Sequence, residues 1–114
     1  MDKLDYIFNM QKFLMKKYGF KGPINIDTKK GQNKIREVMF FMVHEVFEAS
    51  EWMKMKPWRK TIVKTDIKAF LEEIVDVLHF YVELCIYLGI DSNKLTGMYK
   101  EKAYKNLERL KNRY

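Results

Sequence analysis

Apolar residues recur every three or four positions over most of the chain, which is the spacing of amphipathic helices. In the first such segment, Leu4, Ile7 and Leu14 share one face. The predicted helices cover about Lys3–Tyr18, Gln32–Lys54, the segment from a cap at Thr65 or Asp66 to Gly89, and the segment from a cap at Asp91 or Ser92 nearly to the C-terminus.

The breaks between these segments contain residues that end helices or form turns. Gly19 suits the position that follows a helix, and Pro57 prevents the second helix from continuing. Residues 20–34 contain two glycines and a proline and are expected to form a loop. Five glycines and two prolines are too few for the many turns of a sandwich or barrel. We therefore expect residues 1–114 to form one all-α domain, a compact four-helix bundle.

The composition narrows the class of protein and of partner. The formal net charge of +7 favours an anionic partner, either a nucleotide, a nucleic acid or an acidic surface. Cys85, the single cysteine, lies in an apolar run and is expected to be a buried reduced thiol. The N-terminus lacks the pattern of a signal peptide, and the apolar stretch Ile74–Ile90 is interrupted by charged residues. We expect a soluble, cytoplasmic protein with no membrane partner.

Two pairs of carboxylates stand among apolar residues on neighbouring predicted helices. Glu45 and Glu48 are three residues apart and so share one face of the second helix. Glu73 and Asp76 repeat this spacing on the third. Either pair alone is more often part of an ordinary solvated face. Two pairs that face each other inside a bundle would repel, however, and a cation would relieve that repulsion. Oxygen ligands without thiolates favour Mg²⁺, or Mn²⁺, over zinc.

Polar residues on the other two helices point to an anionic ligand. Lys102, Asn106 and Arg109 form one stripe along the fourth helix, which suits phosphate oxygens, although a solvated basic face is a common alternative. Gln11 lies within the apolar stripe of the first helix. A buried glutamine needs hydrogen-bond partners, which could be a nucleobase edge or the protein itself.

These residues resemble the motifs of the all-α nucleoside triphosphate pyrophosphohydrolases, and most closely those of the dimeric dUTPases. Glu45 and Glu48, followed by Glu73 and Asp76, are similar to the E-x-x-E and E-x-x-D metal motifs of that superfamily, which also includes MazG-like enzymes. The finer similarities are residues 72–80 to E-E-x-x-D-x-L-H-F, Lys102, Asn106 and Arg109 to K-x(3)-N-x(2)-R, Lys56-Pro57-Trp58 to a Lys-x-Trp element, and Met10-Gln11-Lys12 to an early Gln element.

The resemblance implies a reaction and a role for each residue. The enzyme would use a metal-activated water to convert dUTP to dUMP and pyrophosphate. The implied metal ligands are Glu45, Glu48, Glu73 and Asp76 around Mg²⁺, with Glu48 also serving as the catalytic base. The implied substrate-binding residues are Lys102 and Arg109 on the phosphates, Asn106 and Gln11 on the sugar or base, and Trp58 along the base. The family habit and the broad apolar surface imply a homodimer or higher homo-oligomer that completes the bundle.

The chain also departs from the typical pattern of that family. Met15 stands where an acidic residue usually follows the Gln element, and the Trp element lies about one residue closer to the first metal motif. The chain is shorter than most relatives. These departures leave dCTP or another nucleoside triphosphate open as the substrate of a MazG-like enzyme.

Other functions explain the sequence less fully. A di-iron carboxylate bundle needs a histidine three residues after a glutamate, and neither His44 nor His79 meets this condition. We expect structural roles for both histidines, with His79 placed to brace a metal ligand. A basic module that binds nucleic acid or a protein partner would explain the charge. It would leave the carboxylate pairs unexplained, because acids weaken binding to a phosphate backbone.

Overall fold

The computed structural model describes residues 2–113, and within this range the chain is helical and contains no strand. The helices are α1 (Lys3–Lys17), α2 (Lys29–Ser50), α3 (Ile67–Tyr87) and α4 (Ser92–Arg113). The prediction of an all-α fold with four helices is therefore confirmed. No helix among these residues is both long and apolar enough to cross a membrane.

The boundaries of α2 differ from those predicted. The helix begins three residues early because the Thr28 side chain accepts a hydrogen bond from the Gly31 amide, at 3.0 Å. A Cβ at Gly31 would lie 1.9 Å from the Asn25 carbonyl oxygen, so only glycine lets the preceding loop pack on this turn. The helix ends at Ser50, four residues before the predicted Lys54. Beyond it, the Thr65 hydroxyl donates to the Trp52 carbonyl and closes the base of the 51–66 loop.

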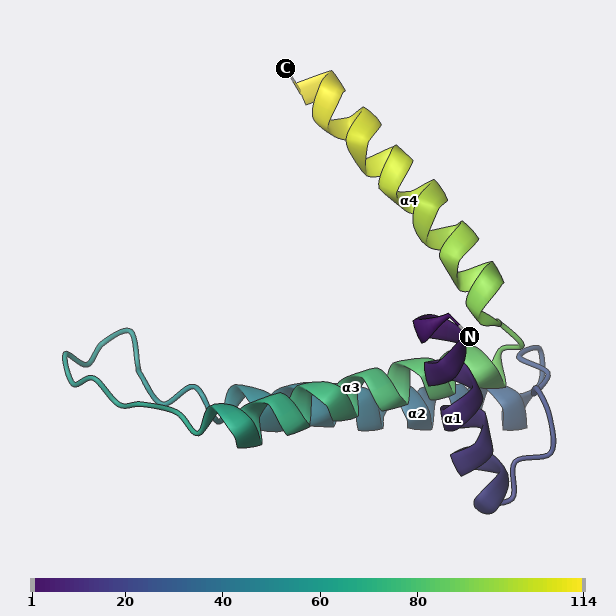
Figure 1. The fold of residues 1–114 in the computed structure, drawn as a ribbon, viewed down its shortest axis with the longest axis horizontal. Helices are drawn as coiled ribbons and strands as arrows, with labels where there is room; N and C mark the ends of the chain where they lie inside the picture. The colour runs from purple at the N-terminus through teal and green to yellow at the C-terminus, as the bar shows by residue number, and fades with distance from the viewer. Residues whose placement is uncertain (1, 114) are drawn as a thin grey trace.

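The helices form a layer in which α3 lies between α1 and α2. The α2 and α3 helices run antiparallel along most of their length, and α1 crosses the C-terminal half of α3 (Figure 1). The buried cluster between α1 and α3 consists of Phe8, Met15, Val82, Cys85 and Ile86. The expected buried thiol is thus found, since Cys85 is free and lies in this core.

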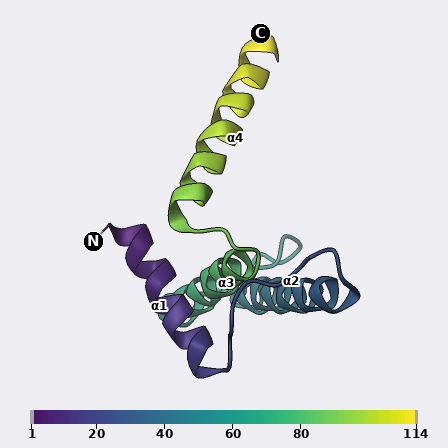
Figure 2. The same cartoon turned by 90° about the vertical axis from the view of Figure 1, so that its right-hand side faces the viewer.

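The fourth helix does not join the layer. Only its beginning packs against α1, and the rest extends away from the other helices (Figures 1 and 2). The radius of gyration is 17.9 Å, whereas a compact domain of this length has about 13 Å. The single chain is therefore not the compact bundle that we predicted. We predicted a compact bundle because the connections between helices are short, but a short connection does not fix the direction in which α4 leaves α3.

Candidate functional site

The antiparallel packing of α2 and α3 brings acidic residues from the two helices to the same level. Glu45 lies in the last two turns of α2, and Glu73 and Asp76 lie one turn apart in the first half of α3. The connecting loop begins and ends at Trp52 and Thr65, which are hydrogen-bonded to each other, so residues equally far from this base face each other. This register places Glu45 opposite the Glu73 and Asp76 pair.

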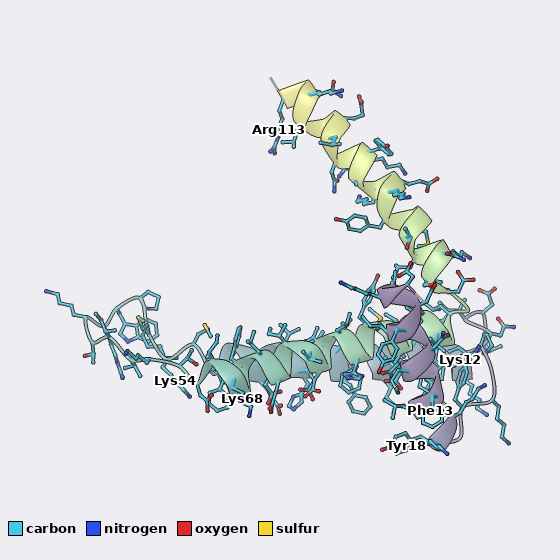
Figure 3. The ribbon with its side chains drawn as sticks, viewed as in Figure 1. Lys12, Phe13, Tyr18, Lys54, Lys68 and Arg113 are labelled. Carbon is cyan, nitrogen blue, oxygen red and sulfur yellow. The ribbon has the colours of Figure 1, made fainter. Side chains whose placement is uncertain are left out.

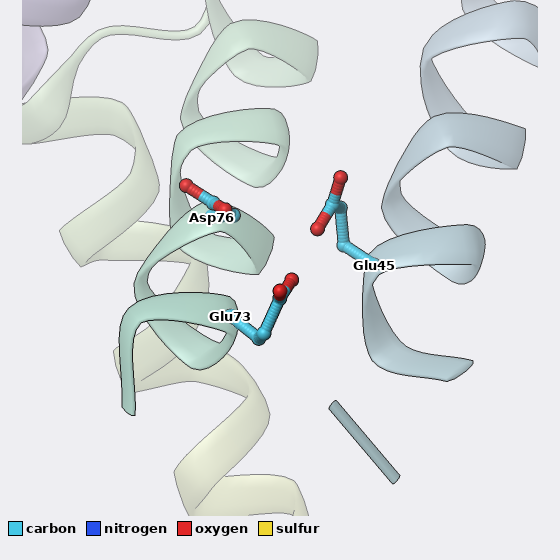
Figure 4. A group of neighbouring side chains, drawn as sticks. All are labelled: Glu45, Glu73 and Asp76. Carbon is cyan, nitrogen blue, oxygen red and sulfur yellow. The ribbon is translucent and has the colours of Figure 1, made fainter. Parts of the chain in front are cut away.

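The three side chains converge in the space between the helices (Figure 4). One carboxylate oxygen from each of Glu45, Glu73 and Asp76 lies within 4.8 Å of the others. The side chains of Glu45 and Glu73 are half-buried, and that of Asp76 is exposed. Among the described residues, no lysine, arginine or histidine forms a salt bridge with any of the three. Their negative charges are therefore not compensated by the protein.

The electrostatics of Glu45 reflect this crowding. Burial is the largest cause that raises the pKa of Glu45, followed by a hydrogen bond with Glu73 and by the negative charges of Glu48, Asp76 and Glu73. Each of these causes disfavours the ionised carboxylate. A proton or a cation at this position would relieve the repulsion. Three hard oxygen donors without a thiolate suit a divalent cation such as Mg²⁺.

Glu48 lies near this cluster but is turned toward a histidine. Its Oε1 atom is 2.7 Å from Nε2 of His44, one turn earlier in α2. It does not belong to the group of three converging carboxylates, although its charge acts on Glu45. The sequence predicted four convergent carboxylates, and the structure places three together and the fourth beside them.

Gln11 is buried between α1 and α3 and is bonded to a second histidine. It is 8% exposed, and its Oε1 lies 2.7 Å from Nδ1 of His79. An amide oxygen only accepts, so Nδ1 of His79 carries the hydrogen and donates it. The Gln11 amide N–H₂ group donates no hydrogen bond to a side chain or backbone group of residues 2–113. We had predicted that His79 braces a metal ligand, whereas the structure shows its Nδ1 atom bonded to Gln11.

A cavity of about 330 Å³ lies beside this pair. Gln11 and His79 are the polar side chains that border it, and apolar residues and one tyrosine form the rest of its wall. These are Tyr6, Ile7 and Met10 from α1, and Val75, Leu78 and Val82 from α3. His79 lies one turn after Asp76, so the cavity is next to the carboxylate cluster along α3.

The remaining predicted substrate-binding residues lie away from the cluster. Trp58 is 75% exposed in the 51–66 loop, which extends beyond the ends of α2 and α3 (Figure 1). Lys102, Asn106 and Arg109 are exposed on α4, where their spacing places them on one face. Because α4 extends away from α2 and α3, a single chain does not bring this stripe to the carboxylates.

A larger cavity, of about 910 Å³, lies at the other end of the α2–α3 pair. It is formed by the loop after α1, the first turns of α2 and Tyr87 near the end of α3. Lys34 lies over the Tyr87 ring there, at 5.4 Å from its centre. Among residues 2–113, Glu37 is the acidic residue that lines this cavity, whereas the group of converging carboxylates lies elsewhere, and we therefore place the candidate site at that group.

The sequence did not reveal two contacts of the site. The Gln11–His79 bond joins residues 68 positions apart, and no local spacing signals such a contact. The His44–Glu48 contact has the i, i+4 spacing of neighbours on a helix, so this signal was available.

Comparison with known proteins identifies the family of the chain. A family model described as dUTPase matches residues 3–97. The matched range contains the three convergent carboxylates, Glu48 and the Gln11–His79 pair, and it ends before Lys102. No curated protein and no solved structure matches the chain.

Proposed function

Because the chain belongs to the dUTPase family, we propose that it is a Mg²⁺-dependent pyrophosphohydrolase that converts dUTP and water to dUMP and pyrophosphate. Family membership supports a dUTPase-like nucleotide pyrophosphohydrolase. The metal, the base and the residue roles are our proposal. The observation that carries it is the convergence of Glu45, Glu73 and Asp76 without a compensating positive charge.

The donor set fits a hard divalent cation. Glu45, Glu73 and Asp76 would hold Mg²⁺ or Mn²⁺, and Glu48, which lies beside them, would add a fourth carboxylate. Bound there, the cation would supply positive charge against phosphate oxygens and lower the pKa of a coordinated water. The half-buried position of Glu45 and Glu73 limits solvent access, which strengthens such electrostatic interactions.

Glu48 is suited to handle the proton of the attacking water. In our proposal its carboxylate orients the water and accepts its proton as the water oxygen bonds to the α-phosphorus. The bond from this phosphorus to the bridging oxygen breaks, and pyrophosphate leaves. His44 Nε2 lies 2.7 Å from Glu48 Oε1, and when Nε2 carries a hydrogen it would donate to this oxygen and hold the carboxylate in place.

The Gln11–His79 pair is suited to bind the base. His79 fixes the Gln11 oxygen, which turns the amide N–H₂ group toward another acceptor. A uracil carbonyl is such an acceptor, whereas the amino group of cytosine is a donor. The adjacent cavity of about 330 Å³ has the mainly apolar wall that suits the faces of a base. This chemistry favours dUTP over dCTP.

The basic stripe is suited to hold the phosphate chain. Arg109 would bind phosphate oxygens with two parallel hydrogen bonds, and Lys102 would add a point charge. Asn106, between them on the same face, would contact the sugar or base, and Trp58 would lie along the base. For these roles the residues must come close to the carboxylates.

The test is a panel of all canonical nucleoside and deoxynucleoside triphosphates with Mg²⁺, scored for pyrophosphate release. We expect release from dUTP, loss of release with EDTA, and recovery with excess Mg²⁺. Rapid release of pyrophosphate from dCTP but not from dUTP would overturn the base assignment. If no nucleotide releases pyrophosphate, the proposal that the protein is a pyrophosphohydrolase is wrong. Release of orthophosphate instead of pyrophosphate would overturn the reaction.

A further inference from the structure

The larger cavity, at the end of the α2–α3 pair away from the carboxylates, has no part in the proposed reaction. Its volume of about 910 Å³ lies within the range of small-molecule sites. Three segments form its wall, namely the loop after α1, the first turns of α2 and the end of α3. Tyr18, labelled at the lower end of α1 in Figure 3, borders it. The cavity is large enough for a ligand of the size of a nucleotide.

Hydrogen bonds and packing hold the wall of this cavity in place. The Ile24 amide donates to the Tyr87 carbonyl at 2.9 Å and so joins the loop to the end of α3. The Thr28 hydroxyl donates to the Asn25 carbonyl at 2.8 Å, and the buried Gly31 packs against the same carbonyl. A ligand would therefore meet a preformed wall, which lowers the entropy cost of binding.

The side chains that line the cavity carry a net positive charge. Lys21, Lys30 and Lys34 line it, and within the described chain Glu37 is the acidic residue that does so. Lys34 forms a salt bridge with Glu37 at 3.8 Å, so these two charges offset each other. Lys21 and Lys30 form no salt bridge with any residue between 2 and 113. Their two ammonium groups therefore favour an anionic ligand.

The start of α2 adds to this positive potential. The helix begins at Lys29, next to the cavity, and has no acidic residue in its first turn. Its aligned peptide dipoles place a partial positive charge at this end, where an acidic side chain is usually favourable. Lysines occupy positions 29 and 30 instead, so like charges gather here. A bound anion would offset their repulsion.

Two amide side chains of the wall are free to donate to such an anion. Asn25 Oδ1 accepts from the Asp27 amide at 2.9 Å, and Asn33 Oδ1 accepts from Arg36 at the same distance. Both asparagines line the cavity. Because each amide oxygen is already bonded, the N–H₂ group is the part of each side chain that is left for a ligand. Phosphate oxygens are acceptors that suit both N–H₂ and ammonium groups.

Aromatic side chains form another part of the wall. The rings of Phe20 and Tyr87 pack edge to face, with their centres 5.5 Å apart, and both residues line the cavity. The Lys34 ammonium lies 5.4 Å from the centre of the Tyr87 ring. An aromatic wall beside several cations suits a ligand in which a flat ring is joined to an anionic group.

We propose that this cavity is a second binding site, which takes a phosphate monoester with a flat ring, such as a nucleoside monophosphate. The lysines and the two asparagine amides bind the phosphate, and the ring lies against the aromatic wall. The concave shape selects a free small molecule over a nucleic-acid duplex or a protein surface. The site is at the opposite end of α2 from Glu45, so binding requires neither the carboxylates nor a metal ion.

Binding can be measured on the full chain in EDTA, which keeps the carboxylate site free of metal. The probes are dAMP, deoxyadenosine and inorganic phosphate, each titrated into ¹⁵N-labelled protein and followed by NMR. We expect dAMP to bind more tightly than either fragment, because it alone contacts both parts of the wall. It should shift the backbone amides of Lys21, Lys30 and Tyr87 and leave that of Glu73 unchanged.

A charge variant tests the phosphate contacts. Lys21 and Lys30 are exposed, so Lys21→Ala/Lys30→Ala should fold like the parent. We expect its affinity for dAMP to fall about tenfold, because two hydrogen bonds to a charged group are lost. The matched control is Lys3→Ala/Lys100→Ala, which removes two exposed lysines elsewhere and should bind dAMP as the parent does.

The possible outcomes are distinct. Equal affinities for dAMP and inorganic phosphate would mean that the wall binds no ring. Equal weakening in both double variants would mean a general attraction between opposite charges, and shifts centred on Glu73 would place dAMP at the carboxylates. Each of these results overturns the second site. Binding of dAMP at the cavity of a protein that releases no pyrophosphate from any nucleotide supports the second site and overturns the proposed function. Release of pyrophosphate by a protein that binds no dAMP does the reverse.

Discussion

At the scale of residues, the decisive feature is the group of three carboxylates with which no basic side chain of residues 2–113 forms a salt bridge. Glu73 is close to both other members, since one of its carboxylate oxygens lies within 4.8 Å of an oxygen of Glu45 and of Asp76. Its charge repels that of Glu45, and a bound cation would offset this repulsion. A change at Glu73 should therefore affect the stability of the metal-free protein and the hydrolysis of dUTP in opposite directions.

Glu73→Gln should abolish dUTP hydrolysis and raise the melting temperature of the metal-free protein. The amide keeps the size of the side chain and removes one of the repelling charges. Millimolar Mg²⁺ should raise the melting temperature of the parent, because a ligand that binds only the folded state stabilises it. The variant should gain less. Calorimetry with and without EDTA measures both effects, and equal gains in the two proteins would show that Glu73 is not a ligand.

His79→Leu should reduce the preference for dUTP over dCTP. The change leaves the Gln11 oxygen without its donor, so the amide is free to turn and present either group to the base. We expect kcat/KM for dUTP to fall about tenfold, the usual value of one oriented hydrogen bond. His79→Asn is the matched control, because its amide nitrogen occupies nearly the place of Nδ1. A ratio of rates that is unchanged in both variants would contradict this role of His79.

Glu83→Gln should stabilise the protein at neutral pH and lose this effect in acid. Burial is the main cause that raises the pKa of Glu83, Glu37 raises it further, and Lys34 lowers it in part. A raised pKa means that the ionised side chain costs folding free energy above that pKa and that the cost disappears as the pH falls through it. Melting curves between about pH 4 and pH 8 test this, with Glu101→Gln on α4 as a control. If the stability gained by Glu83→Gln increased as the pH falls, the pKa of Glu83 would not be raised.

At the scale of elements, the helices depend on local signals that the sequence displays. The Asp66 side chain accepts from the Ala69 amide at 3.1 Å and so caps α3, the helix that carries two of the three carboxylates. Asp66→Ala should lower the free energy of unfolding by about 1 kcal/mol. Urea unfolding measures it, and Asp27→Ala in the loop before α2 is the control. Equal midpoints for the two variants would contradict a capping role.

The same local signals explain which parts of the fold were predictable. Helix caps and stops identified α1, α3 and α4 to within a residue or two, because a cap and its partner lie within four positions. The end of α2 was misplaced, since the chain leaves the helix before Pro57 and is held by Thr65, thirteen residues after Trp52. Contacts between distant residues are not visible as periodicity.

The sequence predicted which carboxylates come together, but it did not predict the contacts of Glu48 and Gln11 or the position of α4. The three-residue spacing on two successive helices, with one connecting loop, was sufficient to place Glu45 opposite Glu73 and Asp76. The turn of Glu48 toward His44 and the bond between Gln11 and His79 are choices of side-chain rotamer in three dimensions. The path of α4 depends on buried contacts of Ser92 and Leu95 with α1, which no spacing along α4 encodes.

At the scale of the whole molecule, the structure has more apolar surface than one chain can cover. Both α2 and α4 expose large apolar side chains along their length, and the radius of gyration of 17.9 Å reflects the unpaired α4. If two copies bury these surfaces together, folding and association are one equilibrium. The melting temperature should then rise with protein concentration, whereas that of a monomer is independent of it.

A charge on the exposed apolar surface of α2 should distinguish a dimer from a monomer. Val43 is exposed in the single chain, so Val43→Asp would cost little stability in a monomer. Within a dimer the same carboxylate would be buried without a partner, at a cost of several kcal/mol. We expect Val43→Asp to have the mass of one chain, to melt at a temperature independent of concentration, and to lose dUTP hydrolysis although every residue of the site is intact. Tyr18→Asp, at the exposed end of α1, is the matched control and should change none of these properties. A parent whose melting temperature stays constant over a hundredfold range of concentration, together with an active Val43→Asp, would mean that one chain forms the site alone and that α4 must turn to reach it.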